Sequence, residues 1–93
     1  MKRKPWSPDS TTIDLGWVVP ACVCDRAESI LKRRGFCISD EMRRDELVVF
    51  CNGDFFVAIY ATDYDMDGRA HAKILIEDKE LDPELVTMLA SIA

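Results

Sequence analysis

Three aspartates occur at alternate positions in a short segment of the second half of the chain: Asp63, Asp65 and Asp67. Oxygen ligands at positions one, three and five, followed by Gly68, match the first half of an EF-hand calcium loop. Position twelve, where such a loop has a bidentate glutamate, is Ile74, and Glu77 comes three residues later. Ordinary turn geometry is therefore the simplest interpretation, an acidic contact for a partner protein the second, and a bound divalent cation the third.

The cysteines are the other candidate metal ligands: Cys22, Cys24, Cys37 and Cys51. Cys22 and Cys24 would share a zinc ion only in an extended segment, because a helix turns alternate side chains about 200° apart. An even number of cysteines in a short chain also permits disulfides. Because polar residues follow the basic start of the chain, we expect no secretory leader and therefore reduced, cytosolic thiols. Apolar neighbours predict that most of these thiols are buried.

Little in the sequence indicates catalysis. His71 is the only histidine, and it falls on the polar side of an alternating segment, so we expect a surface histidine. The glycines occur singly, without the phosphate-binding or nucleophile-elbow patterns. We therefore expect a protein that is not an enzyme and that binds no cofactor. The aspartate loop and the thiols remain as the alternative, a divalent-cation or zinc site.

Two helices are predicted. Apolar residues recur at helical spacing from Val23 to Leu31, and Gly35 follows a basic last turn. This helix begins either at Pro20 or at Asp25, which starts a capping-box pattern. The second helix is predicted to begin at Asp82 and Pro83, as N-cap and first helical residue.

Three strands are predicted between the helices: Leu47–Cys51, Phe55–Ala61 and Ala70–Ile76. Asn52-Gly53 is typical of a two-residue hairpin turn. Residues 55–61 are apolar on both faces, which indicates a central strand. Alternation over residues 13–17 suggests a first strand with Trp17 in the core, and residues 36–39 could add a short one.

The sequence therefore predicts an α+β protein. We expect a two-layer sandwich, with an antiparallel sheet of three to four strands and two helices in the order (β)-α-β-β-β-α. At 93 residues, of which 48% are hydrophobic, the chain fits a single folded domain. We expect that domain to span residues 13–93, after a flexible basic N-terminal arm formed by residues 1–12.

Charge divides the chain into unlike halves. The formal net charge is −5. Residues 1–44 carry nine Lys/Arg and six Asp/Glu, whereas residues 45–93 carry three and eleven. Such an acidic half favours a basic protein partner and argues against direct binding of nucleic acid, whose phosphates it would repel. No apolar run is long enough for a membrane span, so we expect no membrane partner.

In size, charge and element order the chain resembles the anti-CRISPR proteins, small acidic α+β inhibitors made by phages against bacterial defence complexes. The resemblance rests on no shared motif, and no residue roles follow from it. It implies a cytoplasmic inhibitor or nucleic-acid mimic that acts on a nucleic-acid-handling complex. The residues expected to contact such a partner are Asp63, Tyr64, Asp65, Asp67, Glu77, Asp78, Glu80 and Trp6. An exposed sheet edge would also permit a homodimer.

Overall fold

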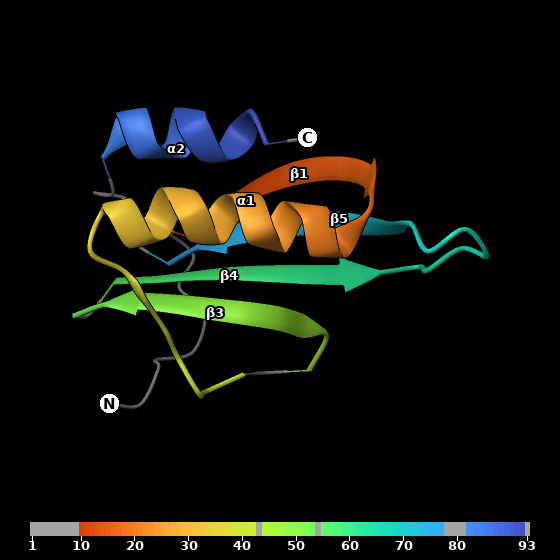
Figure 1. The fold of residues 1–93 in the computed structure, drawn as a ribbon, viewed down its shortest axis with the longest axis horizontal. Coiled ribbons are helices and arrows are strands. Elements are labelled where there is room, and N and C mark those ends of the chain that lie inside the picture. Colours follow the sequence, from red (N-terminus) through yellow and green to blue (C-terminus); the bar gives the residue numbers. More distant parts are fainter. Residues whose placement is uncertain (1–9, 43, 54, 78–81, 93) are drawn as a thin grey trace.

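The computed structural model describes residues 10–42, 44–53, 55–77 and 82–92. Five strands and two helices are arranged as an antiparallel sheet with helices packed on it, which confirms the α+β class (Figure 1). In chain order the elements are β1 (Thr11–Val18), α1 (Pro20–Arg33), β2 (Cys37–Ile38), β3 (Glu46–Asn52), β4 (Phe55–Thr62), β5 (Ala70–Ile76) and α2 (Pro83–Ala90).

The sheet has the strand order β1-β5-β4-β3-β2. The expectation of three to four strands is therefore wrong. Both the first strand and the short strand after α1 form, and β1 pairs with β5 whereas β2 pairs with β3. β2 has only two residues, too few to give a clear alternation in the sequence. The prediction that residues 55–61 form a central strand is confirmed, since β4 pairs on both sides.

The start of β1 bears on the expected boundary between the N-terminal arm and the domain. β1 begins at Thr11, which pairs with Ile76 and lies two residues inside the range expected to form an arm. Residues 1–9, including the basic residues and Trp6 of that range, lie outside the described residues. Neither described helix has the length and apolar character needed to cross a membrane.

Proline determines where α1 begins. Pro20 occupies the first helical position, and the N-cap residue Val19 makes no side-chain capping hydrogen bond. The helix thus starts at the earlier of the two expected positions, and the Asp25–Glu28 pair lies within it. At its other end the Gly35 amide donates to the Lys32 carbonyl at 3.1 Å, and Gly35 has a φ of 89°.

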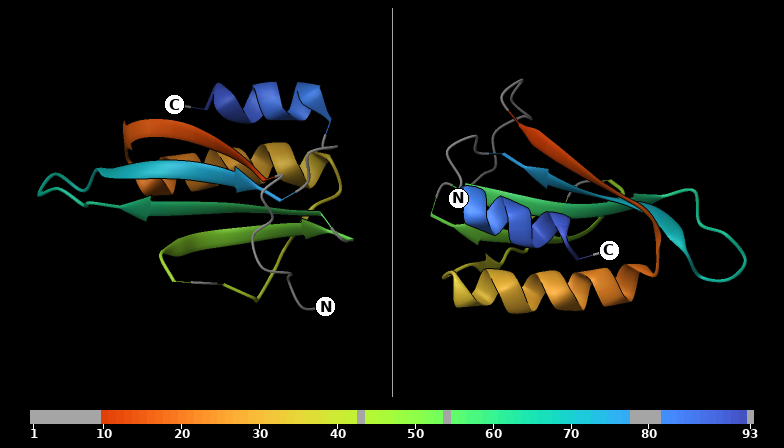
Figure 2. Two further views of the ribbon diagram at one scale, coloured as in Figure 1. Left: turned by 180° about the vertical axis from the view of Figure 1, so that it is seen from behind. Right: turned by 90° about the horizontal axis from the view of Figure 1, so that it is seen from above.

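Both helices lie over the same face of the twisted sheet (Figure 2). The main core lies between them and the sheet, with apolar side chains from every element except β2. Alternate residues of β5, from Ala70 to Ile76, are buried on this side, as the alternation predicted. A second, smaller buried cluster lies on the opposite face and consists of Val49, Phe56 and Ala58.

A β-bulge in β1 changes which side chains face the core. The register moves from Asp14 opposite Lys73 to Gly16 opposite Ala72, so β1 has one extra residue there. Gly16 has a φ of 70°, which suits glycine in a bulge. Trp17 consequently pairs with His71 and is 54% exposed. The prediction that Trp17 lies in the core is therefore wrong.

Candidate functional site

The loop of residues 63–69 joins β4 to β5 and extends beyond the end of the sheet (Figure 1). It contains four of the residues predicted to contact a partner: Asp63, Tyr64, Asp65 and Asp67. Glu77 follows β5 at the opposite end of that strand. At about 3.3 Å per residue, the seven-residue strand separates Glu77 from the loop by roughly 20 Å. Asp78, Glu80 and Trp6 lie outside the described residues.

Hydrogen bonds within the loop fix its shape. The Asp65 carboxylate oxygen Oδ1 accepts from the backbone amides of Asp67 at 2.9 Å and Arg69 at 2.8 Å. The Asp65 amide also donates to the Arg69 carbonyl at 2.9 Å. Asp63 has a φ of 59°, a conformation that aspartate tolerates better than most residues. Asp63 and Asp65 therefore help to form the turn, as the sequence indicated.

The same loop presents apolar side chains to solvent. Tyr64 is 58% exposed, and Met66 is fully exposed at the tip. The carboxylates of Asp63 and Asp67 flank these two side chains in the sequence, and both aspartates are exposed. An exposed aromatic or methionine side chain beside charged groups is typical of the surfaces that bind other proteins.

The geometry gives a calcium site no support. The loop is flanked by strands, and Ile74, at the position of the bidentate ligand, is buried within β5. Within residues 10–42, 44–53, 55–77 and 82–92, no group of three or more His, Cys, Asp or Glu side chains is placed to hold a metal ion. One oxygen of Asp65 already accepts two backbone hydrogen bonds.

The cysteines differ from the expectation of buried thiols. Cys22 and Cys37 are exposed, Cys24 and Cys51 are half-buried, and all four are free. Cys22 and Cys24 both lie in α1, where alternate side chains diverge, so the shared zinc site that required an extended segment is not formed. Burial raises the pKa of the Cys24 thiol, and the nearby carboxylates of Asp25 and Glu28 raise it further.

The side chains of Asp14, Trp17 and His71 lie together on the sheet face away from the helices, close to where the loop joins β5. The Trp17 and His71 ring centroids lie 6.0 Å apart, with an angle of 40° between the planes. The His71 Nε2 atom lies 2.7 Å from Asp14 Oδ1. The backbone amide of Gly16 donates to the same oxygen at 2.8 Å, and this bond, with His71, lowers the pKa of Asp14. The histidine is therefore paired with a carboxylate.

A cavity of about 290 Å³ lies at this end of the molecule. Its walls come from the end of β1, the start of α1, Arg69 at the loop and Ile92 after α2. Arg26 lines it and donates through Nη1 to the Ile92 carbonyl at 2.8 Å. No sequence pattern predicted this part of the surface. For the neighbouring cluster of Asp14, Trp17 and His71, the Asp14-x-Gly16 pattern is a usable signal, because an aspartate two residues before a glycine can stabilise a turn or bulge.

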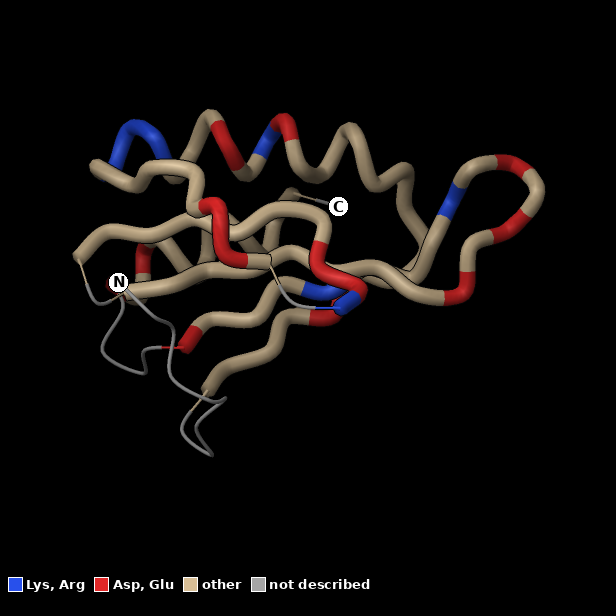
Figure 3. Tube along the Cα trace, turned by 90° about the horizontal axis from the view of Figure 1, so that it is seen from below, with Lys and Arg blue, Asp and Glu red and all other residues tan. Residues whose placement is uncertain are grey.

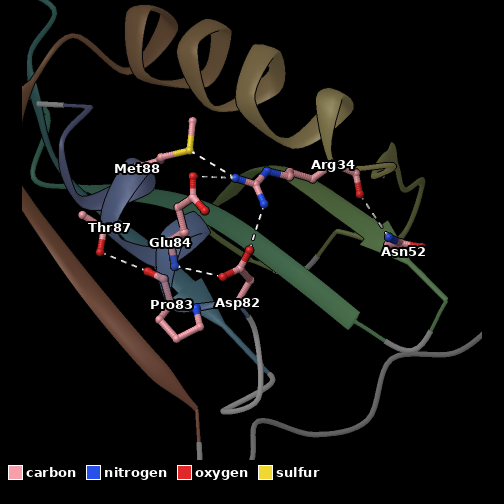
Figure 4. Close-up of polar contacts among 7 residues, drawn as sticks. All are labelled: Arg34, Asn52, Asp82, Pro83, Glu84, Thr87 and Met88. Carbon is pink, nitrogen blue, oxygen red and sulfur yellow. Dashed lines mark hydrogen bonds and ion pairs between the residues drawn. The ribbon is translucent and has the colours of Figure 1, made fainter.

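The charge asymmetry of the sequence does not become an acidic half of the structure. Outside the projecting loop, acidic and basic positions are both distributed over the described chain (Figure 3). Arg34, from the basic half, lies between two late acidic residues, with Nη1 2.8 Å from Asp82 Oδ2 and Nη2 3.4 Å from Glu84 Oε1 (Figure 4). The Asp63–Asp67 segment is therefore a separate acidic feature at the other end of the molecule.

Comparisons with protein-family models, with curated proteins and with solved structures found no significant match to this chain.

Proposed function

We propose that the protein is a non-enzymatic binding module whose Asp63–Arg69 loop engages a basic surface of a partner protein. The observation that carries the proposal is the structure of the loop. Internal hydrogen bonds of Asp65 hold it in one shape, and it presents exposed Tyr64 and Met66 side chains beside carboxylates. Because the loop is already ordered, little conformational entropy is lost on binding.

The side chains of the loop resemble a small interface in composition. Tyr64 and Met66 would supply the apolar centre, and the carboxylates of Asp63 and Asp67 would supply the charged rim. Trp17 and Val19, 54% and 43% exposed, would extend the contact onto the body of the protein. The carboxylates would mainly accelerate association with a basic partner and make it sensitive to salt.

The proposal extends to an inhibitor that acts in the cytoplasm. A two-layer α+β sandwich would carry the loop, and its spaced carboxylates would occupy a surface on which the partner holds nucleic-acid phosphates. The protein would then be a mimic in the manner of the anti-CRISPR proteins, and it would not bind nucleic acid itself.

A homodimer through β1 is the second candidate. β1 has eight residues and lies at the edge of the described sheet, paired with β5 on its other side. Such an edge can pair with a second copy of itself. Light scattering across a range of protein concentrations would show a dimer, and a constant monomer mass would exclude this candidate.

The test of the main proposal is a competition experiment. The tagged protein would capture its partner from a lysate, and the purified partner would then be offered a labelled nucleic acid with and without this protein. We expect this protein to displace the nucleic acid and the displacement to weaken as salt increases. A partner that binds both at once would refute the mimic, and binding unaffected by salt would refute the acidic contact.

A further inference from the structure

Cys37 and Cys51 are directly opposite each other across two neighbouring strands. Cys37 in β2 pairs with Cys51 in β3, and Ile38 pairs with Phe50. One step further, the Ser39 amide donates to the Val49 carbonyl at 2.8 Å. Because hydrogen-bonded pairs alternate along an antiparallel ladder, Cys37 and Cys51 also form a hydrogen-bonded pair, for which the Cα atoms are about 5.5 Å apart. That distance is within the usual range for a disulfide.

The end of α1 holds Cys37 in this position. The Phe36 amide donates to the Leu31 carbonyl at 3.0 Å, so the chain leaves the helix in a fixed direction. The side-chain amide of Asn52, next to Cys51, donates to the Arg34 carbonyl at 3.4 Å (Figure 4). The chain before Cys37 is thus tied to the end of β3 before any bond between the sulfur atoms forms.

The two thiols differ in solvent exposure, which would allow them to react with an oxidant one after the other. Cys37 is exposed, and Cys51 is half-buried against Val49, Phe56 and Ala58 on the sheet face away from the helices. Opposite residues of an antiparallel pair point to the same face, so both side chains lie on that face. An exposed thiol can meet a solution oxidant first, and the neighbouring thiol can then resolve the product.

We propose that Cys37 and Cys51 are a modification site that forms a reversible intramolecular disulfide. The Cys37 thiolate attacks a sulfur of a small disulfide such as glutathione disulfide and releases one glutathione thiolate. The Cys51 thiolate then attacks the Cys37 sulfur of the mixed disulfide and releases the second glutathione. The two protein thiols lose two electrons and two protons, which convert one glutathione disulfide into two glutathione molecules.

The register also explains why the bond is reversible. In a hydrogen-bonded pair the Cβ atoms are about 5.5 Å apart, farther than the roughly 3.5–4.5 Å of a relaxed disulfide. Closing the bond must therefore pull β2 and β3 together, and the resulting strain favours reduction. In a cytosol whose glutathione and thioredoxin keep thiols reduced, such a bond would be transient.

The bond would fix β2, the strand with the fewest paired residues in the described sheet. β2 is paired over two residues, and it carries Ile38, which is 51% exposed. Beside it is a cavity of about 420 Å³ lined by Lys32, Gly35, Phe36, Cys37 and Ile38. Oxidation would hold this edge against β3, and reduction would return it to a two-residue pairing.

The experiment uses the full chain with Cys22→Ser and Cys24→Ser, which leaves the proposed pair as the only thiols. After equilibration in glutathione buffers of different redox ratios, alkylation and intact mass would count the free thiols. We expect both thiols to disappear together, peptide mapping to join Cys37 to Cys51, and dithiothreitol to restore both. The oxidised form should melt about 10 °C higher, because the bond closes a 15-residue loop and the strain offsets only part of that stabilisation.

Two outcomes would overturn the proposal. One is a glutathione adduct that persists on Cys37 while Cys51 remains free, and the other is dimers linked between chains. Cys37→Ser in the same background is the matched control, and its melting temperature should not depend on the glutathione ratio. Because the mapping is done on a chain that keeps both cysteines, it does not depend on whether this control folds.

Discussion

The His71 imidazole and the Asp14 carboxylate are joined across β1 and β5, with Nε2 2.7 Å from Oδ1. The bond lies beside the β-bulge of β1, because the Gly16 amide donates to the same carboxylate oxygen. It also lies next to Trp17, the largest exposed aromatic side chain at this end of the described sheet. Asp14 thus joins β1 to the start of β5, directly after the Asp63–Arg69 loop.

The first prediction concerns pH. The Gly16 amide, with the His71 hydrogen bond, lowers the pKa of Asp14 from its usual value of 3.8. A carboxylate with a lowered pKa in the folded state stabilises the protein above its unfolded pKa, and this effect is lost as the pH falls through the folded value. Asp14→Asn should therefore reduce stability at neutral pH, and the difference from wild type should shrink as the pH falls below 3.8. Urea unfolding at several pH values would measure it.

The control for this experiment is Asp25→Asn, which removes one exposed negative charge from α1. A stability difference between wild type and Asp14→Asn that stays constant down to about pH 2 would contradict the prediction.

The second prediction concerns the bulge. Gly16 has a φ of 70°, and a Cβ atom added there would meet nothing within 4 Å. The cost of Gly16→Ala should therefore come from backbone strain alone, about 1 kcal/mol. Gly16→Asn should cost less, because asparagine adopts this conformation more readily. Equal losses for both variants in urea unfolding would show that the conformation of residue 16 is not the cause.

The third prediction separates two roles of Asp82. Its Oδ1 atom caps α2 by accepting from the Glu84 amide at 3.0 Å, and its Oδ2 atom lies 2.8 Å from Arg34 Nη1. Asp82→Ala removes both interactions and should cost about 1–2 kcal/mol. Asp82→Asn keeps an oxygen for the cap, and should cost less than about 1 kcal/mol because exposed ion pairs contribute little. Thermal or urea unfolding of both variants would compare them, and a larger loss for Asp82→Asn would contradict the assignment.

Local sequence patterns predicted the elements that depend on local rules. The Asp82-Pro83 start of α2 is confirmed, with the expected cap. The central place of β4 is confirmed, since Phe56, Val57, Ala58 and Ile59 are all buried. The hairpin between β3 and β4 is confirmed as well. However, Asn52 is the last residue of β3 and pairs with Phe55, so the turn lies one residue later than expected.

The remaining differences arise from pairing that a sequence pattern does not contain. Trp17 faces away from the core because one residue bulges in β1, which the alternation of residues 13–17 could not reveal. Cys37 and Cys51 have apolar neighbours in the sequence, but Cys37 is exposed and Cys51 is half-buried, because they pair at the edge of the described sheet on the face away from the helices. The acidic second half of the chain was expected to attract a basic partner, yet Asp82 of that half binds Arg34 of the same chain, 48 residues away.

The most direct test of the proposed function is the affinity of the captured partner for a variant with Asp63→Asn, Asp65→Asn and Asp67→Asn. Asparagine keeps the oxygen that accepts the loop hydrogen bonds, so the loop should retain its shape while it loses three charges. The matched control is Glu28→Gln, Asp40→Asn and Glu84→Gln, which changes the net charge equally at positions outside the loop. Isothermal titration calorimetry at low and physiological salt would compare the three proteins.

We expect the loop variant to bind about tenfold or more weakly than wild type at low salt, with a smaller dependence on salt. The control should bind as tightly as wild type. Equal losses in both variants would mean that only net charge matters, and unchanged affinity of the loop variant would contradict the proposal that this loop binds the partner.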